Sequence, residues 1–496
     1  MKQETQSSYR QIFKATSIFG GVQVFSILIA VIRSKFIAVF LGPVGMGISG
    51  LLTESISLIG ALTNFGLSTS AVKNVAAANA SGNQQRIAEM IAVLRKWVWI
   101  TGLLGFAVTL ILSPWLSYVA FGNKDYTVSF MVISITLLIA QLSSGQSVIL
   151  QGMRQIGYLA KAGMVGSVLG LLTSIPLYFF LGEKGIVPSI VTSSITTLFL
   201  SWYFSSKIKL PIVAVSRETV FNEGKGMLSL GFMLSLSGLI TLGLSYLVRI
   251  FISRRGGVAD VGLYGAGFSI INSYVGLIFS AMGTDYYPRL AGVAHDNKAA
   301  SNEINQQGEV ALLIIAPILC IFLVYIDWAI ILLYSKKFIA INSMIHWAAL
   351  GIFFKAASWS VGFLLLAKGA TKVFFWNELF SSIYLLGLNL AGYYYWGLTG
   401  LGISFMIGYI IHLIQMVWVT GQLYGFRYSS KFIKIFFIHL SVVVFCFLNM
   451  KFFHGVARYF VGSFFIALSI FYSLLQLNKR LGLKESLNHF IKRFKK

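Results

Sequence analysis

The sequence predicts an all-α polytopic membrane protein with about fourteen transmembrane helices. Apolar stretches follow one another from Phe13 to Leu477, and each is close to the roughly 20 residues that cross a ~30 Å hydrocarbon core. The composition points the same way, since 57% of the residues are hydrophobic and 11% are charged, with a mean hydropathy of +0.80. No polar stretch long enough for a soluble domain separates the apolar stretches.

The apolar stretches fix the expected spans in order along the chain. Their polar connections are longest at 67–90, 207–225 and 285–308, and all three fall on the same side of the membrane. The spans are expected at residues 14–41, 45–66, 91–113, 127–151, 159–180, 186–206, 227–252, 261–284, 309–333, 344–367, 371–393, 397–420, 432–453 and 456–476.

The basic residues predict the orientation. The chain carries 39 Lys and Arg against 15 Asp and Glu, a net charge of +24. With the N-terminus in the cytoplasm, roughly 27 of the basic residues lie at cytoplasmic ends and loops and about 9 on the other side. We therefore expect both termini in the cytoplasm. Because these charges lie between apolar spans and not on one soluble face, no nucleic-acid partner is expected.

Spaced glycines indicate an internal repeat. Gly45, Gly50 and Gly66 recur 217 positions later, and nearby basic residues recur nearly in step. The later glycines are Gly262, Gly267 and Gly283. Two parallel six-helix lobes are therefore expected, related by a pseudo-two-fold axis along the membrane normal, with two extra C-terminal helices.

The repeat sets the expected domain organisation. An N-terminal lobe is predicted over 1–206, a cytoplasmic connection over 207–226 and a C-terminal lobe over 227–420. An extra helix pair follows at 421–476. The tail at 477–496 has apolar residues at helical spacing among lysines and arginines, which is typical of a basic amphipathic helix on an anionic membrane surface.

Two opposite charges are expected at the same depth in the first two spans. Arg33 lies ten residues before Pro43, and Glu54 lies eleven residues after it. At about 1.5 Å per residue, both are about 15 Å from the turn at Pro43, near the midplane. An Arg33–Glu54 ion pair is therefore geometrically possible. We hypothesise that it holds in one state and is released when an anionic ligand binds Arg33.

Other cations also fall inside spans. Arg249 is the counterpart of Arg33 in the second repeat, and Lys355 lies near the centre of its span. Lys35 lies about 200° around the helix from Arg33, so it faces a cavity only obliquely or extends toward the membrane surface. A charge at mid-bilayer costs about 2.5–3.5 kcal/mol on insertion scales, so each needs a partner or a wet cavity. Together these cations favour a cavity for an anionic headgroup such as a phosphate or diphosphate.

Two carboxylates complete the candidate set beside Glu54. Asp327 is expected near the outer end of span 309–333, and Glu378 about 10 Å into span 371–393. All three are candidates for gating or coupling. For every charge in the set, an interhelical ion pair or a displaced span boundary is the alternative interpretation.

Several chemistries are not expected from this sequence. Cys320 and Cys446 lie in apolar stretches, and the six histidines show no metal-ligand spacing. No glycine-rich loop ends in Gly-Lys-Ser/Thr, so ATP hydrolysis is not expected. We predict no catalytic residue, no metal and no cofactor.

Short motifs in the first two spans carry a family resemblance. LGPVGMG at 41–47, preceded by KFIAVF at 35–40, resembles the bacterial O-antigen translocases, and NFGLSTSAVK at 64–73 fits their glycine-then-basic pattern. These are polysaccharide flippases of the multidrug/oligosaccharidyl-lipid/polysaccharide exporter superfamily. The span count and the two lobes extend the resemblance over the whole chain. In this resemblance Lys35 matches the basic residue before the Gly-Pro turn, and Arg33 is similar to a cavity-lining arginine of related lipid II flippases.

The resemblance implies a function in polysaccharide biosynthesis. It implies an alternating-access flippase of the bacterial inner membrane that moves undecaprenyl-diphosphate-linked oligosaccharide, such as a lipopolysaccharide O-antigen unit, to the periplasmic leaflet. Its partners would be this lipid-linked substrate, membrane lipids and polysaccharide polymerase or assembly proteins. A multidrug or organic-cation antiporter of the same fold is the alternative, and a polytopic polymerase or ligase is a further one. The antiporter should favour carboxylates in its cavity, and the enzyme needs longer extracytoplasmic loops than this chain has.

Overall fold

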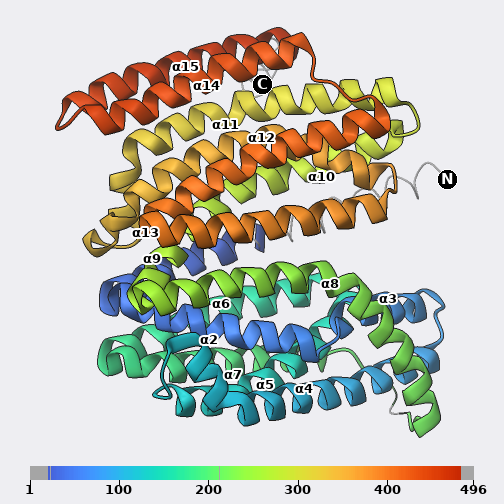
Figure 1. The fold of residues 1–496 in the computed structure, drawn as a ribbon. Helices are drawn as coiled ribbons and strands as arrows, with labels where there is room; N and C mark the ends of the chain where they lie inside the picture. The colour runs from blue at the N-terminus through green and yellow to red at the C-terminus, as the bar shows by residue number, and fades with distance from the viewer. Residues whose placement is uncertain (1–20, 23, 210, 212, 482–496) are drawn as a thin grey trace, which may run out of the picture. The chain divides into compact units, whose positions relative to one another are not determined.

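The computed structural model describes residues 21–481 except 23, 210 and 212, and within these residues the chain is helical without strands. Residues 21, 22 and 24–40 form a helix that precedes α2. The labelled elements (Figure 1) are α2 (Gly42–Thr63), α3 (Leu67–Ala80), α4 (Gln84–Phe121), α5 (Thr127–Gly152), α6 (Ile156–Leu181), η1 (Gly182–Gly185), α7 (Ile186–Ser205), α8 (Arg217–Gly256), α9 (Val258–Ser269), η2 (Ile270–Tyr274), α10 (Val275–Val293), α11 (Asn297–Leu333), η3 (Lys336–Ile341), α12 (Asn342–Ala367), α13 (Thr371–Tyr424), α14 (Ser430–Phe452) and α15 (Ala457–Leu481).

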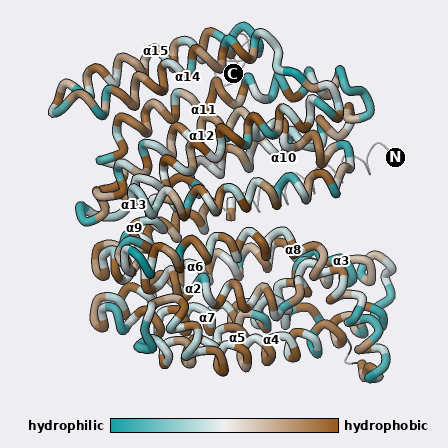
Figure 2. The backbone as a smooth tube through the Cα atoms, viewed as in Figure 1, coloured by the Kyte–Doolittle hydropathy of each residue, from teal (hydrophilic) through white to brown (hydrophobic). Residues whose placement is uncertain are grey.

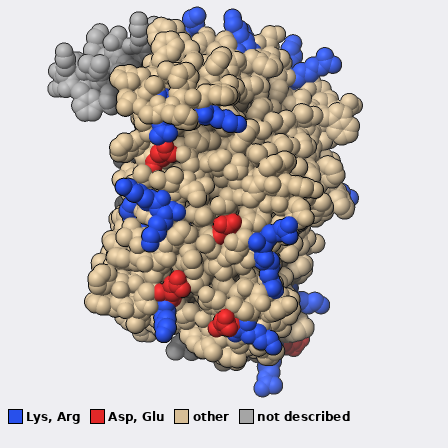
Figure 3. Space-filling view, turned by 60° about the vertical axis from the view of Figure 1, so that its left-hand side comes forward, with Lys and Arg blue, Asp and Glu red and all other residues tan. Residues whose placement is uncertain are grey.

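The predicted polytopic membrane fold is confirmed. Ten segments of the described chain are long and apolar enough to cross a membrane. Two of them, Ile156–Ser205 and Thr371–Tyr424, have 50 and 54 residues, more than twice the length that one crossing needs. Each is broken near its middle, by η1 in the first and at Gly397 (φ 56°, ψ −141°) in the second, so each crosses twice. The helices are apolar along most of their length, and hydrophilic residues concentrate at their ends (Figure 2). On the face in Figure 3, most of the surface is uncharged.

Helix ends follow from local sequence. Pro43 stands in the first turn of α2, where its missing N–H is not needed. Ser216 and Ser429 cap α8 and α14 by accepting hydrogen bonds from Thr219 N and Phe432 N. The helices also continue through much of the polar sequence expected as connections, including 67–80 and 297–308.

The described chain divides into two compact units. Unit 1 comprises residues up to 265 together with 333–335, and unit 2 comprises 266–332 and 336 onward. The sequence placed the boundary between lobes at 207–226, whereas this division falls inside α9. The difference arises because α8 packs against α2, α3 and α4. The two-lobe repeat itself stays a prediction. Of the predicted tail, residues 482–496 lie outside the described residues, as do residues 14–20 of the first expected span.

Glycines allow α8 and α9 to approach α2 and α3 closely within unit 1. Gly66 begins α3 with a φ of 62°, and a Cβ built there would lie 2.1 Å from the carbonyl oxygen of Gly231 in α8. At the other end of α2, a Cβ on Gly47 would lie 1.9 Å from the carbonyl oxygen of Val258. Backbone therefore meets backbone near both ends of α2, which fixes how α8 lies along it.

Unit 2 is built around α11 and α12, which carry many fully buried apolar side chains. Its core includes Leu319, Cys320 and Phe353, together with Val443 and Cys446 from α14. The expected extra helix pair, α14 and α15, lies side by side (Figure 1) and shares this core through residues of both helices.

Candidate functional site

Glu54 of α2 is paired with Arg249 of α8. Arg249 Nη2 lies 3.1 Å from Glu54 Oε1, and the two side chains are 17% and 24% exposed. The sequence hypothesis paired Glu54 with Arg33, and this is wrong for the described structure. The depth of Glu54 counted from Pro43 stays a prediction, and its partner depends on how α8 packs along α2.

The surroundings of this pair leave room for the guanidinium. Arg249 Nη1 lies 3.4 Å from the point where a Cβ on Gly50 would stand and 3.6 Å from the same point on Gly265. The guanidinium carbon lies 5.7 Å from the ring centre of Tyr264. Arg249 Nε is buried and has no hydrogen-bond partner in the part of the chain that the structure describes. The guanidinium therefore keeps one unused donor beside its carboxylate.

A second polar link joins α2 and α8 next to the ion pair. Ser55 Oγ donates to the carbonyl oxygen of Leu51 at 2.7 Å and lies 2.6 Å from Tyr246 Oη. Since the serine proton is already used, Tyr246 donates to Ser55. Tyr246 and Arg249 are three residues apart on α8, so both face α2.

Arg33 lies elsewhere in unit 1, against α6 and α7. Its Nη2 is 2.7 Å from the point where a Cβ on Gly170 would stand, and Ser193 Oγ is 3.5 Å from that point. Arg33 Nε is buried without a hydrogen-bond partner among the described atoms. No ion pair of Arg33 is found among the described residues. Lys35 is partly buried on the same helix.

Lys355 of α12 lies against aromatic rings in unit 2. Its Nζ lies 5.2 Å from the ring centre of Tyr409 and 5.9 Å from that of Phe279. Ser358 donates to the Lys355 carbonyl at 3.2 Å, and its Oγ lies 3.1 Å from His412 Nδ1. In the described residues, no carboxylate forms an ion pair with Lys355. The ring faces supply the attraction that a carboxylate would otherwise provide.

The other two candidate carboxylates differ in their surroundings. Asp327 Oδ2 lies 2.7 Å from Arg458 Nη2, and its Oδ1 accepts a hydrogen bond from Asn342. Asp327 therefore joins α11, α12 and α15. Glu378 is partly buried on α13, and within the described chain it takes part in no ion pair.

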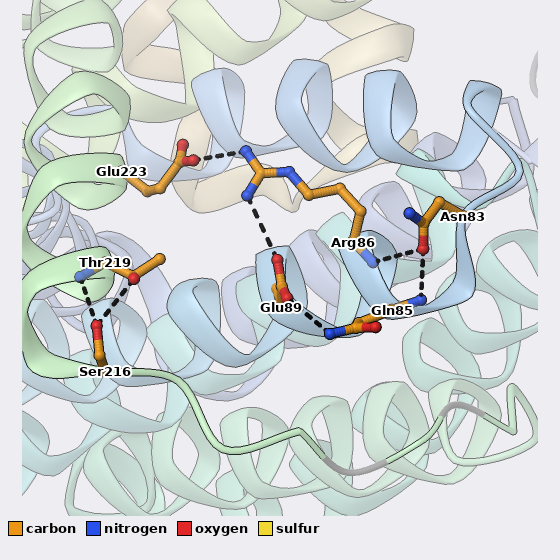
Figure 4. Close-up of polar contacts among 7 residues, drawn as sticks. All are labelled: Asn83, Gln85, Arg86, Glu89, Ser216, Thr219 and Glu223. Atoms are coloured by element: carbon orange, nitrogen blue, oxygen red, sulfur yellow. Dashed lines mark hydrogen bonds and ion pairs between the residues drawn. The ribbon is translucent and has the colours of Figure 1, made fainter.

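Several ion pairs were missed by the sequence reasoning, and two of them tie distant helices together. Glu309, which is 6% exposed, accepts from Arg480 Nη2 at 2.7 Å and from Nε at 2.9 Å, which ties α11 to the end of α15. Arg86 of α4 bonds Glu223 of α8 at 2.5 Å and also lies 3.5 Å from Glu89 (Figure 4). These partners are distant in sequence, so residue spacing carries no signal for either pair.

Beside the Arg86–Glu223 pair, Trp97 of α4 packs against α8. Trp97 Nε1 donates to the carbonyl oxygen of Val220 at 2.8 Å. A Cβ on Gly224 would overlap the indole, at 1.6 Å from Nε1, so only glycine fits there. Together these contacts attach the first two turns of α8 to α4.

The comparisons with known proteins give the family and the fold. A family model described as "Polysaccharide biosynthesis protein" matches residues 36–343, more than half of the chain. The lipid III flippase of Escherichia coli (strain K12) is 22% identical over 354 residues, which are 69% of this chain and 82% of that protein.

Two solved structures share the fold. The lipid II flippase MurJ in an inward closed conformation has a TM-score of 0.70 and 12% identity, with 93% of this chain and 99% of that chain covered. An inward-facing multidrug resistance transporter of the MATE family has a TM-score of 0.65 and 16% identity, with 83% and 96% covered. At these identities the likeness shows a transporter fold.

Proposed function

Because the chain belongs to the polysaccharide biosynthesis protein family, we propose that it is a flippase for a lipid-linked oligosaccharide. The substrate is undecaprenyl-diphosphate-linked, an O-antigen or similar surface polysaccharide unit, and it moves from the cytoplasmic to the periplasmic leaflet by alternating access. The family match and the lipid III flippase relative support lipid-linked transport. The multi-pass membrane fold supplies the framework.

The observation that carries the proposal is the presence of cations inside the spans with unused capacity for an anion. Arg33 has a buried Nε without a partner, Arg249 has another beside its carboxylate, and Lys355 is held by aromatic faces. A diphosphate offers paired acceptor oxygens that an arginine fork binds in two places. We assign Arg33, Lys35 and Arg249 in unit 1, and separately Lys355 in unit 2, to binding anionic groups of the substrate.

Glu54 is assigned a gating role at Arg249. It occupies the guanidinium at 3.1 Å, where a substrate phosphate would otherwise bind. The substrate then displaces Glu54 from Arg249 when it binds. This keeps the sequence hypothesis of a releasable pair and moves it from Arg33 to Arg249. Glu378 stays a candidate coupling carboxylate, while the partners of Asp327 favour a structural role.

The energetics favour outward movement of such a headgroup. The membrane potential changes the free energy of a charge by about 2.3 kcal/mol per 100 mV. An inside-negative potential therefore drives two negative charges outward. The protein has to shelter only the sugars and the diphosphate, because the lipid tail stays in the bilayer.

The proposed orientation follows the basic residues. Both termini lie in the cytoplasm and the protein spans the bacterial inner membrane, since an excess of Lys and Arg marks cytoplasmic loops. Polymerase or other polysaccharide assembly proteins would receive the substrate on the periplasmic side.

Deletion of the gene combined with lipid analysis tests the proposal. In a strain without a redundant flippase, lipid-linked repeat units should accumulate in the inner leaflet while their synthesis continues, and surface polymer should disappear. Undiminished surface polymer would contradict the proposal. A loss of resistance to organic cations, with export intact, would favour the drug antiporter of the same fold instead.

A further inference from the structure

The two arms of α13 enclose a groove that the candidate site does not use. The arms, 371–396 and 398–424, meet at Gly397, and the groove between them has a volume of about 750 Å³. That volume lies within the range of sites that hold small molecules. The groove is lined by Lys372, Val373, Trp376, Asn377, Phe380, Ile411, Ile414, Gln415, Trp418 and Val419.

The walls of the groove are large apolar side chains that face outward. Trp376 and Trp418, one from each arm, are 66% and 65% exposed. Phe380 and Ile414 continue the same lining further from the helix ends and are also well exposed. In a membrane such a surface contacts lipid chains, and paired tryptophans are typical of the interfacial region.

A polar link in the groove lining fixes its shape. Gln415 Nε2 donates to Asn377 Oδ1 at 2.7 Å, and Asn377 Nδ2 donates to Met416 Sδ at 3.1 Å. Asn377 is 6% exposed, so this link between the arms is shielded. This link holds the two arms together at the groove.

Among the residues that line the groove, one is a cation, and it lies at one end of the groove. Lys372 is in the first turn of α13, and Phe380 follows eight residues later, about 12 Å along the helix. The neighbouring Lys368 is already engaged, since it donates to Asn297 Oδ1 at 2.5 Å and lies 5.2 Å from the ring centre of Tyr424. Lys372 makes no hydrogen bond or ion pair within the described residues.

We propose that this groove binds an anionic phospholipid, with its phosphate on Lys372 and one acyl chain along the apolar walls. A positive charge at the membrane surface followed by about 12 Å of apolar lining complements a negative headgroup followed by a hydrocarbon chain. In the proposed orientation the Lys372 end faces the cytoplasmic leaflet, where anionic lipids attract basic groups. The binding claim itself depends on neither the flippase function nor the orientation.

Native mass spectrometry of the purified full-length protein tests the proposal. The probes are dioleoylphosphatidylglycerol and dioleoylphosphatidylcholine, which share their acyl chains and differ in headgroup charge. Wild type should bind phosphatidylglycerol more tightly, and Lys372→Gln should weaken that binding about fivefold, the effect of one lysine near a charged surface. Lys434→Gln is the matched control, because Lys434 is an exposed lysine at the start of α14 outside the groove. It should retain the wild-type preference.

Tryptophan quenching by brominated phosphatidylglycerol locates the lipid. The quenched fluorescence should fall in Trp376→Phe and Trp418→Phe if the lipid lies in the groove. Equal binding of the two lipids by wild type, or an equal loss in Lys434→Gln, would overturn the proposal. Displacement of phosphatidylglycerol by a lower concentration of undecaprenyl phosphate would also overturn it, because the groove would then select a polyprenyl chain. Export assays on Lys372→Gln report on the flippase function separately.

Discussion

Arg249 and Lys355 are both cations inside membrane-spanning helices, yet the two compact units satisfy them in different ways. In unit 1, Arg249 faces the carboxylate of Glu54 at 3.1 Å. In unit 2, Lys355 lies against the rings of Tyr409 and Phe279. Both cations lie near aromatic rings, since Arg249 also lies 5.7 Å from the ring centre of Tyr264, but only the planar guanidinium can bond a carboxylate through two nitrogens. An incoming phosphate must therefore displace an anion at Arg249, while no anion has to leave Lys355.

The largest effect is expected at Arg33, which has neither kind of partner among the described residues. Arg33→Glu should abolish export because it places a negative charge where we assign the diphosphate, and Arg33→Lys should retain part of it. Surface polymer is measured beside the protein level in the membrane. Export by Arg33→Glu at normal rates would remove this residue from the site.

Charge reversal at Arg249 separates ligand binding from folding. Arg249→Glu should abolish export and lower the free energy of unfolding by about 3 kcal/mol or more, because it leaves two carboxylates face to face. The double variant Glu54→Arg with Arg249→Glu restores an ion pair, so it should recover the protein level without recovering export. Recovery of both would show that the pair is only structural.

At Lys355 the comparison predicts a loss of function with little loss of stability. Lys355→Met should lower export by about tenfold to a hundredfold, since a hydrogen bond to a charged group contributes about 1.5–3 kcal/mol. The methionine still packs against Tyr409 and Phe279, so thermal unfolding of the purified protein should change little. Lys355→Arg, which keeps the charge, is the matched control and should export better than Lys355→Met. A marked drop in thermal stability without loss of export would show that Lys355 stabilises the fold and does not bind the substrate.

Asp327 should behave as a structural residue. Asp327→Asn loses the ion pair with Arg458 and should lower the free energy of unfolding by about 1–3 kcal/mol, since the pair is partly exposed. Export per folded molecule should stay near that of wild type. If export falls while stability holds, Asp327 belongs with the coupling carboxylates after all.

The smallest effect is expected at Gly50. The Cβ of Gly50→Ala would lie 3.4 Å from Arg249 Nη1, an ordinary contact, so export should stay within about twofold of wild type. Gly50→Val, with two further methyl groups, should displace the guanidinium from Glu54 and reduce export more. Equal export by both variants would show that the position of this guanidinium is not critical.

Much of the fold was predictable because the apolar stretches alone specify spanning helices. The expected turn between 393 and 397 falls at Gly397, and span 127–151 matches α5 closely. The continuation of helices into polar sequence, as in α3 and the start of α11, was not visible because there the polar residues are compatible with both helix and loop.

The sequence indicated which charged residues fall inside helices but not which residues they pair with. Position along a helix predicts a level for Glu54, since the rise per residue is fixed. Which neighbouring helix supplies the counter-charge depends on tertiary packing, and glycine contacts such as Gly66 against Gly231 decide it. For the same reason the Glu309–Arg480 pair, 171 residues apart, left no pattern in the sequence.

The length of α8 has a mechanical consequence. Its 40 residues follow a path of about 60 Å, twice the thickness of the hydrocarbon core, and the helix bends toward its N-terminal end (Figure 1). The contact with Trp97 lies near one end of this path and Arg249 near the other. The helix is continuous through this bend, so we expect a rearrangement around Arg249 to reach Glu223, about 39 Å away along the helix path. A reporter dye placed in the water-exposed turns of α8 would sense events deep in the bilayer.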